Sequence, residues 1–312
     1  MIQDHPSNMS AIRAYLQLVR FPAVFSAMAD VLVGFLLTRD SLLIDGCPLP
    51  VLLLVAASSC LYLAGMAFND VFDREVDARE RPNRPIPSGR VPLRNAVGLG
   101  IALIAGGLAA AGFAGLHSLL VAGALLAAIF AYDGILKNSA VGPVAMGLCR
   151  TLNVLLGASA AADVSFLWSH PALTLAGCYG VYIAGLTWFA KHEAGRSPRG
   201  SLIAATAVID AGLVSMFFVA LSEQYGFGSQ APVFNVQVAG AVVAVVVNRA
   251  LFLAIADPSP QRVQRAVKTM LQWLIMLDAT LVFAVSGNAT YGLITASLMV
   301  PAVVIGYWLY VT

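Results

Sequence analysis

Charged side chains are scarce in this sequence: Asp, Glu, Lys and Arg make up 11% of its 312 residues. A soluble domain of this length is about one-quarter charged, because its surface must face water. Hydrophobic residues account for 59% instead, so most of the surface must face an apolar medium, and lipid is the ordinary candidate. The net charge of +2 is small and no extended basic stripe is present, which excludes a nucleic-acid partner.

Other common signals are also absent. The cysteines show no CxxC pattern and no metal-ligand spacing, which argues against a zinc or redox site. No low-complexity linker divides the chain, so we expect a single domain over residues 1–312. The first 20 residues are polar and lack a cleavable signal-peptide pattern. We therefore expect the first hydrophobic segment to be retained as a membrane span.

Long hydrophobic runs dominate the chain. Windows of about 20 apolar residues are long enough to cross the hydrocarbon core as helices, and too long for barrel strands. Ten such windows occur, at 21–38, 50–69, 93–115, 117–136, 140–162, 171–190, 201–222, 235–256, 266–287 and 290–311. The sequence therefore predicts an all-α, polytopic integral membrane protein with nine to ten transmembrane helices.

The basic residues give this protein an orientation. If the chain alternates sides through the ten windows, 15 of the 18 Lys and Arg residues lie on the N-terminal side. Arg39 alone lies on the opposite side, and Arg150 and Arg249 fall inside windows. An excess of Lys and Arg marks the cytoplasmic face. We therefore expect the N-terminus and the loops on its side to be cytoplasmic.

The second window ends in a run of oxygen-bearing side chains, Asn69, Asp70, Asp73 and Asp77. If the helix continues past the membrane, Asn69, Asp73 and Asp77 form one ridge, with Asp70 at its edge. Carboxylates at this spacing repel one another unless a cation lies between them. Such a row of hard oxygen ligands suits Mg²⁺, which takes the rest of its shell from water and substrate phosphates.

The next segment favours this metal site over a solvated helix end in which Asp70 pairs with Arg74 and Asp77 pairs with Arg81. Residues 81–90 read Arg-Pro-Asn-Arg-Pro-Ile-Pro-Ser-Gly-Arg. The prolines fix φ and pre-order the loop, and guanidinium groups match phosphate oxygens as rigid forks. Carboxylates for a metal beside arginines for phosphate indicate a diphosphate site at a membrane surface.

At these positions the sequence resembles the UbiA superfamily of intramembrane prenyltransferases. The likeness is carried by Asn69-Asp70-x-x-Asp73-x-x-x-Asp77, followed by Asn83-Arg84-Pro85-Ile86-Pro87-Ser88-Gly89-Arg90. The resemblance implies helices around a central cavity and Mg²⁺-dependent transfer of a prenyl group from a polyprenyl diphosphate to an acceptor. It implies metal binding by Asn69, Asp73 and Asp77, to which we add Asp70. Asp73 and Asp77 are then also catalytic residues, and Arg81 and Arg84 bind the diphosphate.

The resemblance covers roughly residues 12–200. Tyr132 and Lys137 match a Tyr and a Lys of the family, the Lys lying near phosphate, although Lys137 is also placed to be an interfacial anchor. Arg150 and Asn153 share a helix face deep in the fifth window, where an ionisable residue normally faces a cavity or a partner. We expect these four residues to bind substrate, and a structural salt bridge is the alternative for Arg150.

The second signature of the family is missing. The family usually carries Asp-x-x-x-Asp after the sixth helix, whereas residues 191–199 contain no aspartate and Glu193 is their only carboxylate. Lys191, His192 and the arginines of this loop, Arg196 and Arg199, are able to grip a diphosphate directly in place of a second metal. We expect Lys191 and Glu193 to be catalytic and His192 to bind substrate, unless His192 is incidental. The altered loop is similar to that of a divergent branch called EboC.

The sequence thus predicts a Mg²⁺-dependent prenyltransferase of a bacterial inner membrane or its equivalent. Its expected partners are a polyprenyl diphosphate, a lipophilic or aromatic acceptor and membrane lipid. A terpene cyclase of the same family and a non-catalytic prenyl-lipid-binding or transport subunit are the alternatives. We expect the other charges within windows, Asp30, Asp210, Arg249 and Asp278, to pair with each other or with Arg150.

Overall fold

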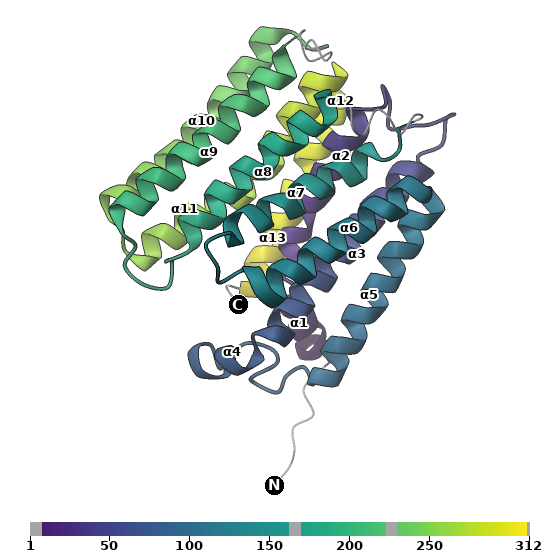
Figure 1. Ribbon diagram of the computed structural model, residues 1–312. Helices are drawn as coiled ribbons and strands as arrows, with labels where there is room; N and C mark the ends of the chain where they lie inside the picture. Colours follow the sequence, from purple (N-terminus) through teal and green to yellow (C-terminus); the bar gives the residue numbers. More distant parts are fainter. Residues whose placement is uncertain (1–7, 162–169, 223–229, 311–312) are drawn as a thin grey trace.

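A computed structural model gives the fold for residues 8–161, 170–222 and 230–310 (Figure 1). These residues form helices, and their only β-type pairing is an isolated bridge between Ile44 and Cys47. The helices in chain order are α1 (Asn8–Leu18), η1 (Phe21–Ala23), α2 (Val24–Leu36), α3 (Leu49–Phe72), α4 (Arg74–Glu80), α5 (Leu93–Ala114), α6 (Leu116–Ala131), η2 (Tyr132–Leu136), α7 (Gly142–Ala158), α8 (His170–Ala190), α9 (Arg199–Leu221), α10 (Val233–Ala256), α11 (Pro260–Ser286), α12 (Ala289–Ser297) and α13 (Met299–Tyr310).

Helices occupy all ten predicted windows, which confirms the all-α membrane class. Within the described ranges, eight helical segments are long and apolar enough to cross a membrane. The bent pair of α1 and α2, with a 47° angle between its halves, brings the number to nine. The fifth window forms α7, which is shorter, with 17 residues. Which face of the bundle is cytoplasmic stays a prediction.

The last helix returns to the side where the chain begins. Arg13 Nη2 and Gln17 Nε2, both on α1, donate hydrogen bonds to the carbonyl oxygen of Leu309 on α13, at 3.1 and 2.8 Å. In Figure 1 the lower end of α13 accordingly lies near α1. An even number of crossings, as the ten windows require, produces this arrangement.

Helix α2 is the buried axis of the bundle. Eleven of its 13 residues are buried, because it packs against α3, α7 and α11. A helix that is apolar on all sides belongs inside other helices. The peripheral helices behave in the opposite way: Phe113 on α5 and Phe252 on α10 are 83% and 69% exposed. Exposed apolar surface on this scale is what a lipid-facing bundle presents.

Small residues allow α2 and α7 to approach closely. A Cβ atom added to Gly34 on α2 would lie 1.9 Å from the carbonyl oxygen of Val154, and one added to Gly157 on α7 would lie 2.2 Å from that of Val31. Neither position therefore accepts a side chain without separation of the helices. Small residues at such contacts let backbones pack closely in lipid, where dispersion forces hold helices together. The contact fixes the position of α7, which carries Arg150 and Asn153.

Candidate active site

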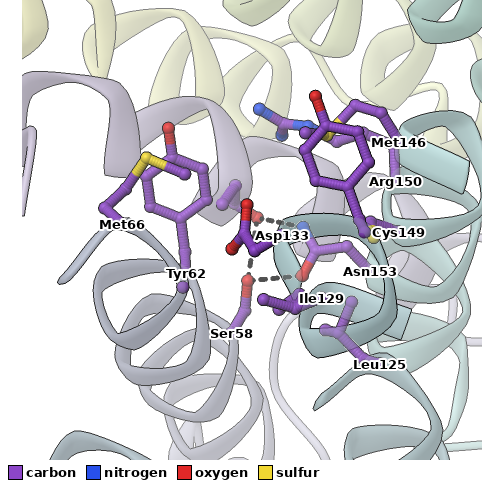
Figure 2. Close-up of a pocket in the computed structure, with 13 residues that line it drawn as sticks. Ser58, Tyr62, Met66, Leu125, Ile129, Asp133, Met146, Cys149, Arg150 and Asn153 are labelled. Carbon is purple, nitrogen blue, oxygen red and sulfur yellow. Dashed lines mark hydrogen bonds between the residues drawn. The ribbon is translucent and has the colours of Figure 1, made fainter. Parts of the chain in front are cut away.

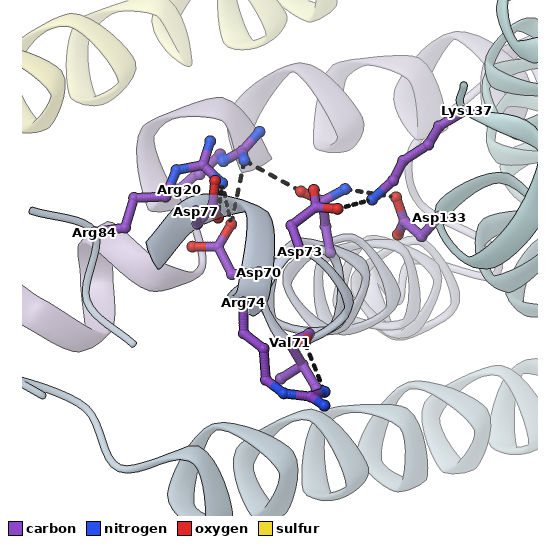
Figure 3. Close-up of polar contacts among 10 residues, drawn as sticks. Arg20, Asp70, Val71, Asp73, Arg74, Asp77, Arg84, Asp133 and Lys137 are labelled. Atoms are coloured by element: carbon purple, nitrogen blue, oxygen red, sulfur yellow. Dashed lines mark hydrogen bonds and ion pairs between the residues drawn. The ribbon is translucent and has the colours of Figure 1, made fainter. Parts of the chain in front are cut away.

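The first aspartate-rich motif lies at a break between two helices. α3 ends at Phe72, Asp73 forms a turn, and α4 begins at Arg74. Hydrogen bonds from Asp73 N to Asn69 O (3.0 Å) and from Asp77 N to Asp73 O (2.8 Å) keep the helical spacing through this turn. The predicted single ridge is nevertheless wrong, because cations from different parts of the fold draw the side chains into two groups (Figure 3).

The first group is built around Arg84. Its Nη1 lies 3.1 Å from Asp70 Oδ1 and 2.6 Å from Asp77 Oδ2, so one guanidinium nitrogen bridges two buried carboxylates. Arg20 completes the group from the end of α1, with Nη2 3.3 Å from both Asp70 Oδ1 and Asn69 Oδ1. The backbone of Arg20 is left-handed, with φ of 47° and ψ of 47°. A non-glycine residue in this region costs on the order of 1–3 kcal/mol and is typical of functional sites.

The second group faces the end of the fourth window, which forms α6 and η2. Asn69 Nδ2 donates to Asp133 Oδ1 at 2.8 Å, and Lys137 donates a hydrogen bond to Asp73. Asp133 lies in η2, a π-helical segment over Tyr132–Leu136, and Lys137 directly follows it. Such widened turns often occur at functional sites, because they redirect side chains from a regular helix. Figure 3 shows Asp73, Lys137 and Asp133 on one side of the α3 terminus and Arg84 with Asp77 on the other.

The alternative of a solvated helix end, in which Asp70 pairs with Arg74 and Asp77 pairs with Arg81, is also wrong. Arg74 donates to Val71 O at 3.4 Å and to Glu75 Oε1 at 3.1 Å, and it points away from both groups in Figure 3. Asp70 and Asp77 are instead 4% exposed, and they pair with Arg20 and Arg84, which lie outside the helix that carries the motif. Burial of paired carboxylates is costly without such partners. The motif is therefore an internal charge cluster.

An apolar pocket opens beside the second group (Figure 2). It occupies about 60 Å³ between α2, α3, α6 and α7. Three predicted substrate-binding residues, Tyr132, Arg150 and Asn153, line it together with Asp133. Because Asp133 also holds Asn69, the same carboxylate belongs to the polar cluster and to the pocket wall.

Arg150 combines the two roles that the sequence leaves open. It lines the pocket, and its Nη1 donates to Asp30 Oδ2 at 2.5 Å while its Nη2 donates to Ser26 Oγ at 2.9 Å. Its guanidinium carbon also lies 5.8 Å from the ring centroid of Tyr62. The structural salt bridge is thus present. Any contact of Arg150 with substrate would be made by a side chain already fixed by α2.

Of the other charges predicted to pair within the windows, Asp30 pairs with Arg150, whereas the predicted charge pairing is wrong for Asp210 and Asp278, and Arg249 forms no ion pair among the described residues. Asn153 Nδ2 donates to Asp30 Oδ2 at 2.9 Å, and its Oδ1 accepts from Ser58 at 2.6 Å. Tyr179 donates to Asp278, and Asn248 donates to Asp210 at 3.0 Å. Asp30 is therefore the carboxylate that pairs with Arg150, whereas Asp210 and Asp278 bind neutral donors.

The second loop brings only one predicted residue towards the cluster. Lys191 and His192 are exposed, while Glu193 is half-buried and interacts electrostatically with Arg81 and Arg20. Burial raises the pKa of the Glu193 carboxyl, and the two arginines partly oppose that increase. The loop is anchored by Gln264, whose Nε2 donates to Glu193 O at 3.2 Å. Arg81, a predicted diphosphate-binding residue, is exposed, and its charge acts on the Glu193 carboxyl.

Sequence reasoning missed two members of the cluster. Arg20 was counted only as a charge of the N-terminal side, yet it binds Asn69 and Asp70. Its signal is local: an arginine stands directly before Phe21-Pro22, where a helix must end. Asp133 stands between the two residues used for the resemblance, and its spacing of four from Lys137 places both on one helix face.

The donor chemistry fits Mg²⁺ even though the cluster is not a preassembled metal cage. In the described parts of the chain, no three His, Cys, Asp or Glu side chains gather closely enough to hold an ion. Asp70 and Asp77 share one cation, Arg84, so a divalent ion placed between them would meet two hard oxygen ligands. One or two carboxylates plus substrate phosphates are the usual protein-bound shell of Mg²⁺.

Comparison with known proteins agrees with this geometry. Residues 27–275 match the UbiA prenyltransferase family. The chain belongs to this family. As a UbiA protein it is similar in sequence to enzymes called digeranylgeranylglyceryl phosphate synthase. That of Sulfurisphaera tokodaii is 28% identical over 148 residues, 47% of this chain and 52% of the relative. That of Korarchaeum cryptofilum is 32% identical over 161 residues, 50% and 54% of the two chains. The chain thus spans about half the length of the curated relatives it matches.

Solved structures share the UbiA fold. A UbiA homologue from Aeropyrum pernix has a TM-score of 0.67 and 23% identity, covering 83% of this chain and 96% of that one. A homologue from Archaeoglobus fulgidus, described as bound to GPP and Mg²⁺, has a TM-score of 0.57 and 17% identity, covering 91% and 99%. At these identities the likeness establishes the fold. The predicted UbiA-like membrane fold is thereby confirmed.

Proposed function

We propose that this protein is a Mg²⁺-dependent intramembrane prenyltransferase that moves a prenyl group from a polyprenyl diphosphate to a lipophilic acceptor. One observation carries the proposal. The hydrogen bond between Asn69 and Asp133 joins a cluster of carboxylates and cations to an apolar pocket. A prenyl diphosphate has the same two parts, a charged head and an apolar chain, in the same order.

The head group meets matched charges. Asn69, Asp70, Asp73 and Asp77 are the residues that would hold Mg²⁺, which when bound supplies neutralisation of the departing diphosphate. Arg84 and Lys137 now bind these carboxylates, and each becomes available to phosphate oxygens when its carboxylate partner turns to a metal. Arginine binds phosphate as a fork, and lysine binds it as a point charge.

The apolar pocket would hold the prenyl chain and shield its reactive first carbon from water. The bond between the first prenyl carbon and the diphosphate oxygen breaks, pyrophosphate leaves, and the acceptor bonds to that carbon and loses a proton. Tyr62 and Tyr132 present aromatic rings near the pocket, and aromatic faces stabilise developing positive charge. Met66 and Met146 also line the pocket. Their flexible side chains can move to admit a chain larger than the present space.

The second loop is assigned a supporting role. Glu193 is half-buried and its pKa is raised, which moves a carboxylate towards the range suited to accepting a proton from an acceptor hydroxyl. Lys191 and His192 are exposed on the same loop and are proposed to meet the diphosphate only when substrate is bound. We also place this loop, the first motif and the N-terminus on the cytoplasmic side, following the distribution of Lys and Arg.

The names of the relatives support an acceptor class. A digeranylgeranylglyceryl phosphate carries prenyl groups on a glyceryl phosphate, so a phosphorylated lipid alcohol is the first acceptor to test. Purified protein would be incubated with geranylgeranyl diphosphate and Mg²⁺, with and without such a lipid, and the products identified by mass spectrometry. The proposal predicts pyrophosphate together with a prenylated lipid, formed only when acceptor is present.

Two other outcomes would replace the proposal. Pyrophosphate and a hydrocarbon formed without any acceptor would identify a terpene cyclase. Intact prenyl diphosphate that remains bound, with no pyrophosphate in the presence of phenolic and lipid-alcohol acceptors, would identify a binding or transport subunit.

A further inference from the structure

A second pocket, separate from the candidate active site, lies between the adjoining ends of α10 and α11. It has a volume of about 260 Å³. Arg249 lines it from α10, and Arg262, Arg265 and Thr269 line it from α11. These α11 positions are spaced by three and four residues, so they form one face of the helix. The pocket shares no lining residue with the apolar pocket beside Asp133.

Among the described residues, only one of the three positive charges of this pocket has an acidic partner. Its lining holds three guanidinium groups and no acidic side chain. Arg262 pairs with Asp257 at 3.8 Å, and that carboxylate is 62% exposed and does not line the pocket. Over the ranges the structure describes, Arg249 and Arg265 form no ion pair within 4.0 Å. Like charges on facing helices repel, so the arrangement favours a bound anion.

The depth of Arg249 points to a lipid as the source of that anion. Arg249 precedes the end of α10 by seven residues, which is about 10 Å along a helix. Thr269 follows the start of α11 by nine residues, so the two lie at similar depth and Arg262 and Arg265 lie nearer the mouth. An arginine this far inside a span is costly unless its head reaches polar groups. Positive charges therefore line the pocket from its mouth, at Arg262 and Arg265, to the depth of Arg249.

Ordinary interfacial arginines do not explain this arrangement. Lys268, on the same helix, does not line the pocket, although it is exposed like the three pocket arginines, so it is the residue expected of a group that only marks the cytoplasmic face. We propose that the pocket between α10 and α11 binds a phosphate group, namely the headgroup of an anionic membrane lipid. Basic pockets between helices near the cytoplasmic face are suited to anionic headgroups. The inference does not depend on prenyl transfer.

The test compares lipid retention by matched variants. The protein would be placed in nanodiscs of phosphatidylcholine with or without phosphatidylglycerol, and retained lipid and thermal stability would be measured. Phosphatidylglycerol should be retained in preference to phosphatidylcholine and should raise the melting temperature. Arg249→Gln combined with Arg265→Gln should weaken that retention about tenfold or more, whereas Lys268→Gln should leave it unchanged.

Further arms separate the sources of phosphate and guard against misfolding. Inorganic phosphate would be added to detergent-solubilised protein without lipid. Stabilisation by phosphatidylglycerol alone identifies a lipid headgroup site, and equal stabilisation by inorganic phosphate identifies a phosphate site that accepts free anion. If the double variant does not fold, Arg262→Gln, at the exposed mouth, replaces it. Equal phosphatidylglycerol retention in the arginine variant and in Lys268→Gln would overturn the proposal.

Discussion

Asn69 donates a hydrogen bond of 2.8 Å to Asp133, and these two side chains connect the first aspartate-rich motif to the wall of the apolar pocket. Asn69 lies in the last turn of α3, and Asp133 lies in the π-helical segment after α6. The bond orients the Asn69 amide so that its oxygen accepts a hydrogen bond from Arg20, which also donates to Asp70. Asp133 is therefore a positioning residue for a proposed metal ligand.

Replacing Asp133 should raise the Mg²⁺ concentration that the reaction requires. Asp133→Leu removes the acceptor for Asn69, so the Mg²⁺ concentration needed for half-maximal pyrophosphate release should rise about 10–100-fold. Asp133→Asn keeps a carbonyl oxygen at the same place and should retain most of the affinity. A Mg²⁺ titration of both variants distinguishes positioning from a general structural defect. The account of Asp133 fails if the leucine and asparagine variants need the same Mg²⁺ concentration as the unmodified protein.

Glu193 should make stability depend on pH. Its pKa is raised above the ordinary value of 4.5 because the carboxyl is partly buried. The folded protein then binds this proton more tightly than the unfolded chain does. Its contribution to stability is fully present below the unfolded pKa and is lost as pH rises through the folded pKa.

Glu193→Gln should therefore raise the melting temperature near pH 8 and have little effect near pH 4. Thermal unfolding across this range, with the exposed Glu80→Gln as control, measures the difference. A Glu193→Gln curve that runs parallel to that of the unmodified protein at every pH would show that burial of Glu193 has no energetic consequence.

The contact between α2 and α7 should tolerate no added methyl group. Gly157→Ala places a Cβ 2.2 Å from Val31 O, so the helices must separate and lose packing, at a cost of about 1–3 kcal/mol. Gly98→Ala on α5 is the matched control, because a Cβ there meets nothing within 4 Å. Melting temperatures in one detergent compare the two. Equal stability of both variants would mean that α7 is positioned by other contacts.

Much of this architecture could be predicted because hydrophobic length and basic loops are local properties of the chain. The ten windows became helices, and the loop around Arg84 reached the motif that precedes it. The pairing of charges could not be predicted in the same way. Arg20 and Asp70 are 50 residues apart, and Arg150 and Asp30 are 120 apart. Such partners are chosen by helix packing, which spacing along one helix does not describe.

The turn at Asp73 shows the same limit on a smaller scale. A continuous helix would align Asn69, Asp73 and Asp77, and the backbone hydrogen bonds do continue through the turn. The side chains separate because Lys137 lies on one side and Arg84 on the other. The residue types of the site were therefore readable, whereas the direction of each side chain required the positions of α6 and of the loop that follows α4.

The most direct test of the proposed prenyl transfer is release of pyrophosphate from geranylgeranyl diphosphate in the presence of Mg²⁺ and a phosphorylated lipid alcohol. Asp73→Asn should reduce the rate about 100-fold or more, because one carboxylate that would hold Mg²⁺ is lost, and with it part of the neutralisation of the departing diphosphate. Glu75→Gln, an exposed substitution on the adjoining helix, should leave the rate within about twofold of the unmodified protein, as surface changes do. A rate for Asp73→Asn equal to that of Glu75→Gln would contradict the account.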